Sequence, residues 1–173
     1  PARALVSGED GARLIDEHGK TVASLPAGDW YWPTGSAWLL RADADAAGNP
    51  VTVYTDTTGK TRLTLPGTAT SFSEGQAAVV LPNGNMRAVN EKGVESGPTF
   101  SYIGPRRDGL AAVLVGDRYG YADSQGRLAI TPVYLWASAY ANQRAVVSTR
   151  DLSMIVDERG TMVARVTMEC GIR

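Results

Sequence analysis

The fold follows from residues 108–134, which read DGLAAVLVGDRYGYADSQGRLAITPVY. Two apolar segments, 111–115 and 119–123, are joined by a short turn that contains glycine, which is typical of an antiparallel hairpin. The box Asp123-Ser124-Gln125-Gly126 is a second turn signal, because aspartate caps a type I turn and glycine accepts a positive φ at its exit. A third segment, 127–131, ends at a proline. The stretch therefore predicts a three-stranded β-meander.

The same box recurs along the whole chain, with Asp or Asn first and Gly fourth. The five boxes are Asp16–Gly19, Asp56–Gly59, Asn90–Gly93, Asp123–Gly126 and Asp157–Gly160. Their starts are 40, 34, 33 and 34 residues apart, and a near-constant period of this length is the signature of a repeat architecture. The one long interval coincides with an insertion rich in Ala and Asp at residues 42–49.

Two further landmarks keep this register. An apolar segment that opens on alanine precedes each box, and a proline follows each of the first four boxes. The alanines are Ala4, Ala37, Ala77, Ala111 and Ala145, and the prolines are Pro26, Pro66, Pro98 and Pro132. We therefore predict a single repeat domain, 1–173, with repeats at approximately 1–34, 35–71, 72–106, 107–140 and 141–173.

Glycine and proline also argue against α-helix. Outside 133–159 one of them occurs at least every 13 residues, which is close to the mean length of a helix. The sequence predicts an all-β fold of five repeats of about 34 residues, each a three-stranded β-meander, stacked as an open twisted array or a small propeller. Propeller blades usually carry four strands, so three strands per repeat favour the open array.

Composition excludes several classes of function. The chain has 173 residues and a net charge of −1, whereas nucleic-acid and anionic-membrane surfaces carry a basic excess. One cysteine, Cys170, and one histidine, His18, exclude an internal disulfide, a thiolate zinc site and two-histidine metal sites. Apolar runs stop at about strand length, far below the ~18 residues of a membrane span. We expect no cofactor, no metal, no nucleic-acid partner and no membrane insertion.

Two features of the sequence bear on the cellular location. The chain begins at Pro1 and has a single cysteine, which is compatible with a removed signal peptide. We therefore expect an extracytoplasmic location, periplasmic or secreted, in preference to the cytoplasm.

Residues 108–134 resemble a bacterial WG repeat. That family's pattern runs Phe-Ser-x-Gly-x-Ala-x-Val, then Trp-Gly-Tyr-Ile-Asp-x-x-Gly, then Ile-x-Pro-x-Tyr. The third repeat matches the opening part at residues 72–79, FSEGQAAV, and the fourth carries Tyr119-Gly120 in place of the Trp-Gly pair. The resemblance implies an array of β-meanders without shared catalytic residues.

Aromatic residues are the main candidates for a binding site. Four residues after each proline stand Trp30, Thr70, Tyr102 and Trp136. Such rings either cover the edge of their own repeat or line one face that binds a partner or a sugar. The shared register predicts that Trp136 belongs to the core. Tyr31 has no aromatic counterpart and is predicted at the surface, whereas Trp32 aligns with Phe72 and Tyr140 and is predicted in the core.

The insertion at 42–49 supplies two more candidates. Asp43-Ala44-Asp45 is similar to the opening of a calcium loop, but Ala47 and Tyr54 stand where further ligands are needed. A loop tipped with solvated charge is therefore the expected structure. Insertions in repeat proteins often decorate a binding face, so Asp43 and Asp45 are predicted partner contacts.

These observations predict a non-enzymatic binding module that recognises another protein. One concrete form is an immunity or inhibitor protein against a bacterial toxin. The alternative is carbohydrate or cell-wall binding through Trp30, Tyr31, Tyr102 and Trp136. No motif places a nucleophile near His18, and no motif selects a catalytic pair among the 18 acids.

Overall fold

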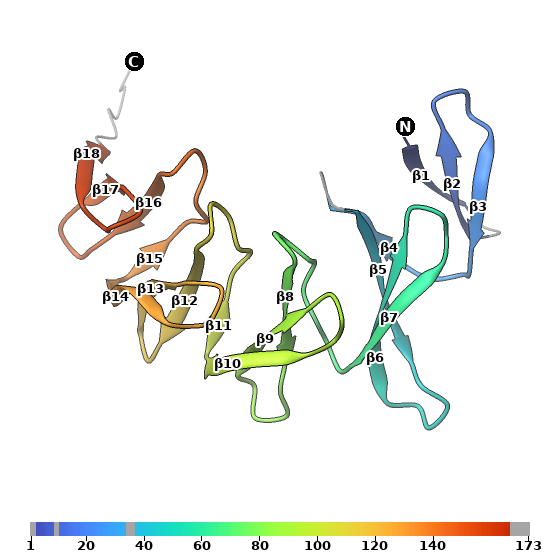
Figure 1. Ribbon diagram of the computed structural model, residues 1–173, viewed down its shortest axis with the longest axis horizontal. Coiled ribbons are helices and arrows are strands. Elements are labelled where there is room, and N and C mark those ends of the chain that lie inside the picture. The colour runs from blue at the N-terminus through green and yellow to red at the C-terminus, as the bar shows by residue number, and fades with distance from the viewer. Residues whose placement is uncertain (1–2, 9–10, 34–36, 167–173) are drawn as a thin grey trace, which may run out of the picture. The chain divides into compact units, whose positions relative to one another are not determined.

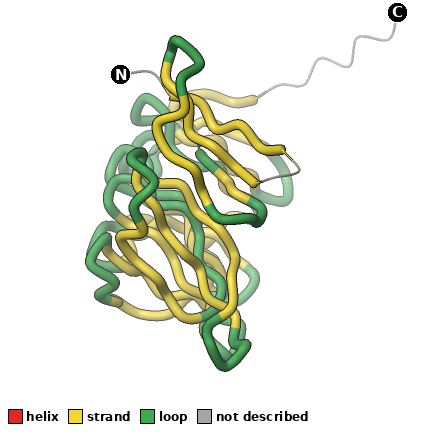
Figure 2. Tube along the Cα trace, turned by 90° about the vertical axis from the view of Figure 1, so that its right-hand side faces the viewer, coloured by secondary structure: helices red, strands yellow, loops and turns green. Residues whose placement is uncertain are grey.

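A computed structural model describes residues 3–8, 11–33 and 37–166 (Figure 1). All regular secondary structure in these described residues is β-strand, which confirms the predicted all-β class (Figure 2). No helix in the described residues is long and apolar enough to cross a membrane.

The strands form five antiparallel meanders, in which neighbours along the chain are neighbours in the sheet. The first sheet comprises β1 (Arg3–Gly8), β2 (Gly11–Asp16) and β3 (Thr21–Leu25). The second comprises β4 (Trp30–Tyr31), β5 (Trp38–Ala44), β6 (Pro50–Asp56) and β7 (Thr61–Pro66). The third comprises β8 (Gln76–Val80), β9 (Met86–Asn90) and β10 (Glu95–Phe100). The fourth comprises β11 (Tyr102–Ile103), β12 (Ala111–Val115), β13 (Arg118–Ala122) and β14 (Leu128–Tyr134). The fifth comprises β15 (Trp136–Ala137), β16 (Ala145–Ser148), β17 (Ser153–Val156) and β18 (Met162–Val166).

Three sheets contain one strand more than predicted. The additional strands β4, β11 and β15 are two residues long and begin at the aromatic positions Trp30, Tyr102 and Trp136. In the third repeat, Ala69 forms an isolated bridge with Val79 at the corresponding place. The segment after each proline is therefore a short outer strand that pairs with the following apolar segment, rather than a simple connection.

The chain forms two compact units. The first comprises Pro1–Val80 and Val89–Val94, and the second comprises Leu81–Ala88 and Glu95–Arg173. The first two sheets thus lie in the first unit and the last two in the second.

All five Asp/Asn-x-x-Gly boxes form the predicted turns. In each turn the glycine has a φ between +77° and +85°, and its N–H donates to the first residue's carbonyl at 2.9 or 3.0 Å. The first residue's Oδ1 accepts the backbone N–H groups two and four residues later, at 2.8–3.1 Å. Aspartate and asparagine both supply this acceptor, which explains why either can open the box.

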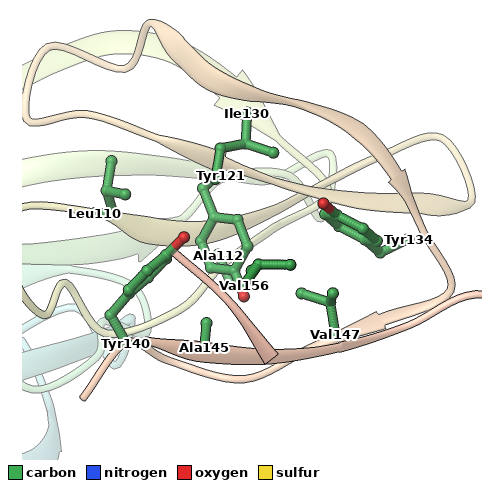
Figure 3. Close-up of a cluster of buried hydrophobic side chains, with 9 residues drawn as sticks. All are labelled: Leu110, Ala112, Tyr121, Ile130, Tyr134, Tyr140, Ala145, Val147 and Val156. Atoms are coloured by element: carbon green, nitrogen blue, oxygen red, sulfur yellow. The ribbon is translucent and has the colours of Figure 1, made fainter. Parts of the chain in front are cut away.

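The cores lie between consecutive sheets. In the second unit, the buried Tyr121 ring of the fourth sheet meets Tyr140 edge-on, at 4.8 Å between centroids, and packs over the fifth sheet (Figure 3). The Tyr121 hydroxyl donates to the carbonyl of Ser138 at 2.9 Å, so its polar end is satisfied. In the first unit, Leu14 and Leu25 pack with Leu39 of the second sheet.

Turn glycines hold neighbouring repeats close together. A Cβ added at Gly59 would lie 2.5 Å from Ala23 Cβ, and one at Gly126 would lie 2.6 Å from Pro98 Cδ. The corresponding distances are 3.0 Å to Leu63 for Gly93 and 3.1 Å to Ile130 for Gly160. In each case the turn of one repeat rests on the last strand of the preceding sheet, where an added side chain would be tightly crowded.

Substitution of Gly126 tests this contact. Gly116 is the matched control, because its φ is also positive, at +62°, but no atom of the described residues lies within 4 Å of an added Cβ. We expect Gly116→Ala to lower the free energy of unfolding by about 1–2 kcal/mol through the backbone conformation alone. Gly126→Ala should cost a further ~1 kcal/mol or more, because it also overpacks the junction. Equal losses in a urea titration would contradict the close approach.

Candidate binding surfaces

The predicted aromatic residues occupy two different environments. Tyr31, Trp136 and Tyr102 are 59%, 50% and 40% exposed, whereas Trp30 is partly buried. Tyr31 lies at the surface, as predicted. The prediction that Trp136 belongs to the core is wrong.

Strand alternation explains the exposure of Trp136. Ala137 pairs with Val147 and packs against the second unit's core, so the adjacent Trp136 points from the opposite face of the sheet. Trp136 pairs there with Ser148. Tyr102 holds the same position in the fourth sheet, where its ring leans on Tyr119 at 6.1 Å between centroids. The same position of the repeat is therefore beside an aromatic ring in the fourth sheet, whereas in the fifth sheet it is beside a serine and is open to solvent.

Trp30 is held by contacts within its own unit. Its Nε1 donates to the carbonyl of Pro26 at 2.9 Å, and the Arg41 guanidinium lies 5.2 Å from the ring centroid. This cation–π contact uses a ring face that a sugar would need. Trp32 is partly buried against the same core cluster. Phe72 and Tyr140, which align with Trp32, are 6% and 2% exposed, so the prediction that they belong to the core is confirmed.

Asp43 and Asp45 lie on a hairpin rather than in an irregular loop. The insertion lengthens β5 and β6, whose pairing extends to Ala44 and Pro50. Asp43 forms an ion pair with Arg41. Asp45 opens a sixth turn of the box type, since its Oδ1 accepts the N–H groups of Ala47 and Asn49, both at 2.9 Å. Both carboxylates therefore already have partners on this hairpin.

Turn geometry also sets the acidity of the box aspartates. The backbone N–H of Thr161 is the main cause of the lowered pKa of Asp157. Desolvation alone would raise the pKa of Asp56, but hydrogen bonds from Thr58 and Arg62 outweigh it and lower the pKa. These carboxylates are spread one to a turn, and the described residues contain no group of three His, Cys, Asp or Glu that could hold a metal ion. Cys170 lies outside the described residues.

The outward face of the fifth sheet is a candidate binding surface, which we call the trailing face. Its members share a side of the sheet opposite Val147 and Val156, as the pairing register shows. They are Trp136, Val146, Ser148, Ser153, Ile155, Ala164 and Val166. Five of the seven are apolar, and Trp136, Ala164 and Val166 are exposed.

One position of this face is buried in the other four sheets. The residues two before each turn box are Leu14, Tyr54, Ala88 and Tyr121, which are 0%, 0%, 9% and 0% exposed. Ile155 is the fifth member of this set and is only partly buried. Sequence reasoning missed the trailing face, although aligning the five repeats on their boxes brings these residues into one column.

A second candidate is an apolar groove in the second unit, with a cavity volume of about 320 Å³. Its apolar lining residues are Pro98, Phe100, Leu114, Val115 and Leu128, and its polar lining residues are Asn85, Thr99 and Ser101. Val115 and Leu128 are 43% and 49% exposed, so apolar surface is open to solvent there. No residue of this groove was among the predicted site residues.

Five sheets, most of them four-stranded meanders, define a β-repeat protein with blade-like units. Residues 119–152 match the family described as WG containing repeat, which confirms the resemblance indicated by the sequence. The match begins at Tyr119-Gly120, where the family's Trp-Gly pair stands. No curated protein sequence matches the chain.

Two solved structures align with most of this chain at low sequence identity. Dihydro-heme d1 dehydrogenase NirN, in complex with DHE, is 14% identical with a TM-score of 0.57, over 95% of this chain and 43% of that chain. BamB from Moraxella catarrhalis is 13% identical with a TM-score of 0.47, over 96% of this chain and 61% of that chain. The chain thus spans less than two thirds of either protein, and the likeness concerns the fold alone.

Acid stability tests the role of the box carboxylates. Because the pKa of Asp157 is lowered in the folded state, its contribution to stability is present above the unfolded pKa of about 3.9 and is lost as pH falls through the folded value. Asp157→Asn keeps the acceptor, as Asn90 does in the third box, but removes this titration. We expect the variant to lose less stability than the wild type between pH 7 and pH 3. Parallel pH profiles would show that the carboxylate charge is irrelevant to folding.

Proposed function

We propose that the chain is a non-enzymatic binding module that recognises another protein through the groove of the second unit. The observation that carries this proposal is the composition of the groove, in which apolar side chains adjoin polar ones. Protein interfaces combine an apolar core with a polar rim, whereas sugar sites present rings flat to solvent. The repeat scaffold supports the same function, because repeat arrays offer extended surfaces to partners.

The groove indicates the chemistry of its partner. A cavity of about 320 Å³ whose lining includes Leu114, Val115 and Leu128 suits apolar side chains of the partner. Asn85 and Ser101 can exchange hydrogen bonds with the partner's backbone around that side chain. The net charge of −1 provides little long-range steering, so association should be slow and only weakly dependent on salt.

The absence of catalysis is part of this proposal. The described aspartates with lowered pKa values all cap turns, and the buried tyrosines Tyr54, Tyr121 and Tyr140 donate their hydroxyls to backbone carbonyls. These groups thus serve the fold. An immunity or inhibitor protein is the specific form that we propose, in which the module covers the working surface of a bacterial toxin.

Carbohydrate or cell-wall binding is a second candidate. The exposed rings of Tyr31 and Trp136 favour it, because sugars stack on aromatic faces that are open to solvent. Trp30 fits this role less well, since its ring already faces Arg41. Trp136 is therefore the residue on which the glycan alternative chiefly depends.

A capture experiment with matched variants tests the protein-binding function. Leu128→Lys places a charge in the groove, and Val133→Lys makes the same kind of change on the same strand outside it, at a side chain that is 54% exposed. Both changes are at the surface and should alter stability by less than about 0.5 kcal/mol. We expect a protein from the native host to be retained by the wild type and by Val133→Lys, and lost with Leu128→Lys.

The captured protein is then purified and its affinity measured. Leu128→Lys should raise the dissociation constant by about thirtyfold or more, as expected for loss of an apolar contact in the binding site. If the partner is a toxin, the chain should inhibit its activity with the same dependence on Leu128. Retention that does not distinguish the two lysine variants would contradict the groove as the binding site.

Soluble cell-wall fragments test the alternative. Binding through Trp136 should quench tryptophan fluorescence, and Trp136→Phe should abolish the quenching. The wild type should show no such change if the protein-binding proposal alone holds.

A further inference from the structure

Consecutive sheets meet through two different faces. Between the fourth and fifth sheets, the face that bears Ala112, Tyr121 and Ile130 packs against the face that bears Val147 and Val156 (Figure 3). The first of these is the trailing face of the fourth sheet, equivalent to the trailing face defined above for the fifth. We call the second the leading face. The residue two before each turn box lies on the trailing face, and the residue one before it lies on the leading face.

Burial along the repeats shows where each kind of face is covered. On leading faces, Thr55, Val89, Ala122 and Val156 are 1%, 0%, 2% and 0% exposed. Ile15, in the first repeat, is the exception and is only partly buried. On trailing faces the exception is Ile155, in the last repeat. The chain therefore has an open leading face at its first sheet and an open trailing face at its fifth.

Two positions of the open leading face carry the same residue types as a covered one. Ala4 and Val6 stand 141 residues before Ala145 and Val147, with the same residue types. Ala145 and Val147 are 3% and 0% exposed, whereas Ala4 is exposed and Val6 is 36% exposed. Apolar side chains of this kind are typical of an interface, and here they face solvent.

The contact between a turn and the preceding repeat is also missing at the first and the last repeat. Each of four turn glycines contacts the preceding repeat at or next to one position, the seventh residue after the start of that repeat's box, which we call the receiving position. These glycines are Gly59, Gly93, Gly126 and Gly160. Gly19 has no such contact, because among the described residues no atom lies within 4 Å of a Cβ built there. In the last repeat the receiving position is Ala164, which is exposed. Ala23 fills this position at the first junction, beneath Gly59, so an alanine there already accepts a turn in this chain.

We propose that two copies of this chain associate head to tail, with the trailing face of the fifth sheet of one copy covering the leading face of the first sheet of the other. The new junction repeats the internal ones, with the Asp16–Gly19 turn seated on Ala164 and Val6 placed beside Val146 and Ile155. These observations select a second copy as the occupant of the trailing face. Elsewhere in the chain a trailing face is covered by a leading face and a turn, and the first sheet of a second copy supplies both.

An interface of this type joins unlike surfaces and therefore leaves one face of each kind open on every dimer. Such heterologous contacts continue into larger assemblies until a ring closes. Blocking one face of a copy ends the assembly on that side but leaves its other face able to bind. This asymmetry provides the test.

The test uses the full chain with one face blocked at a time. Val6→Asp places a charge on the leading face, Ala164→Asp places one on the trailing face, and Val94→Asp is a control at a side chain that is 56% exposed and lies on neither. Masses are measured by sedimentation velocity over a range of protein concentrations. We expect the wild type and Val94→Asp to form species larger than the 18.4 kDa monomer as concentration rises. Each blocked variant alone should remain monomeric.

An equimolar mixture of the two blocked variants is the decisive sample. It should form a one-to-one dimer and nothing larger, which also shows that both variants are folded. A wild type that is monomeric at every concentration, an assembly that survives either substitution, or a mixture that stays monomeric would each overturn the proposal. Neither substitution lies in the groove, so capture of a partner through Leu128 is a separate result.

Discussion

The structure depends on the close approach between a turn and the strand of the preceding repeat. At Gly126 one residue must both adopt a positive φ and leave room for Pro98, and only glycine does both. The aspartate three residues earlier fixes the turn by accepting two backbone N–H groups. A single four-residue box thus closes the hairpin and sets the distance between neighbouring sheets, which is why its spacing persists while the Trp-Gly pair has changed.

Each internal sheet packs against a neighbouring sheet on both of its faces, which affects both the strand sequences and the surface available to a partner. Ala111, Ala112 and Val113 are all buried, because alternate side chains enter different junctions on the two sides of the sheet. Little of an internal sheet is left for a partner. Binding surfaces must therefore come from the edges of sheets, where the groove lies, and from faces that no neighbouring repeat covers.

Much of the fold could be predicted from the sequence, because turn chemistry is local. The five boxes, the buried Phe72 and Tyr140 and the exposed Tyr31 follow from residue type and register. The exposure of Trp136 could not be predicted in that way, because a count from the proline does not show which face of the short strand β15 the ring occupies. The strands β4, β11 and β15 were missed because two-residue strands carry no periodicity of their own. The groove was missed because it gathers residues from separate turns and strands.

The two surfaces differ in how they couple to folding. An internal repeat gains stability from two junctions and a terminal repeat from one, because repeats contact only their neighbours. Complete burial of a side chain such as Ile15 or Ile155 contributes about 1.5–3 kcal/mol, and part of that is missing at both ends. Any occupant of an end face supplies the missing contacts, so binding there also raises the stability of the fold by mass action. A partner that fills the groove raises the stability by the same mass action, but it covers exposed side chains such as Val115 and Leu128 and leaves the junctions as they are.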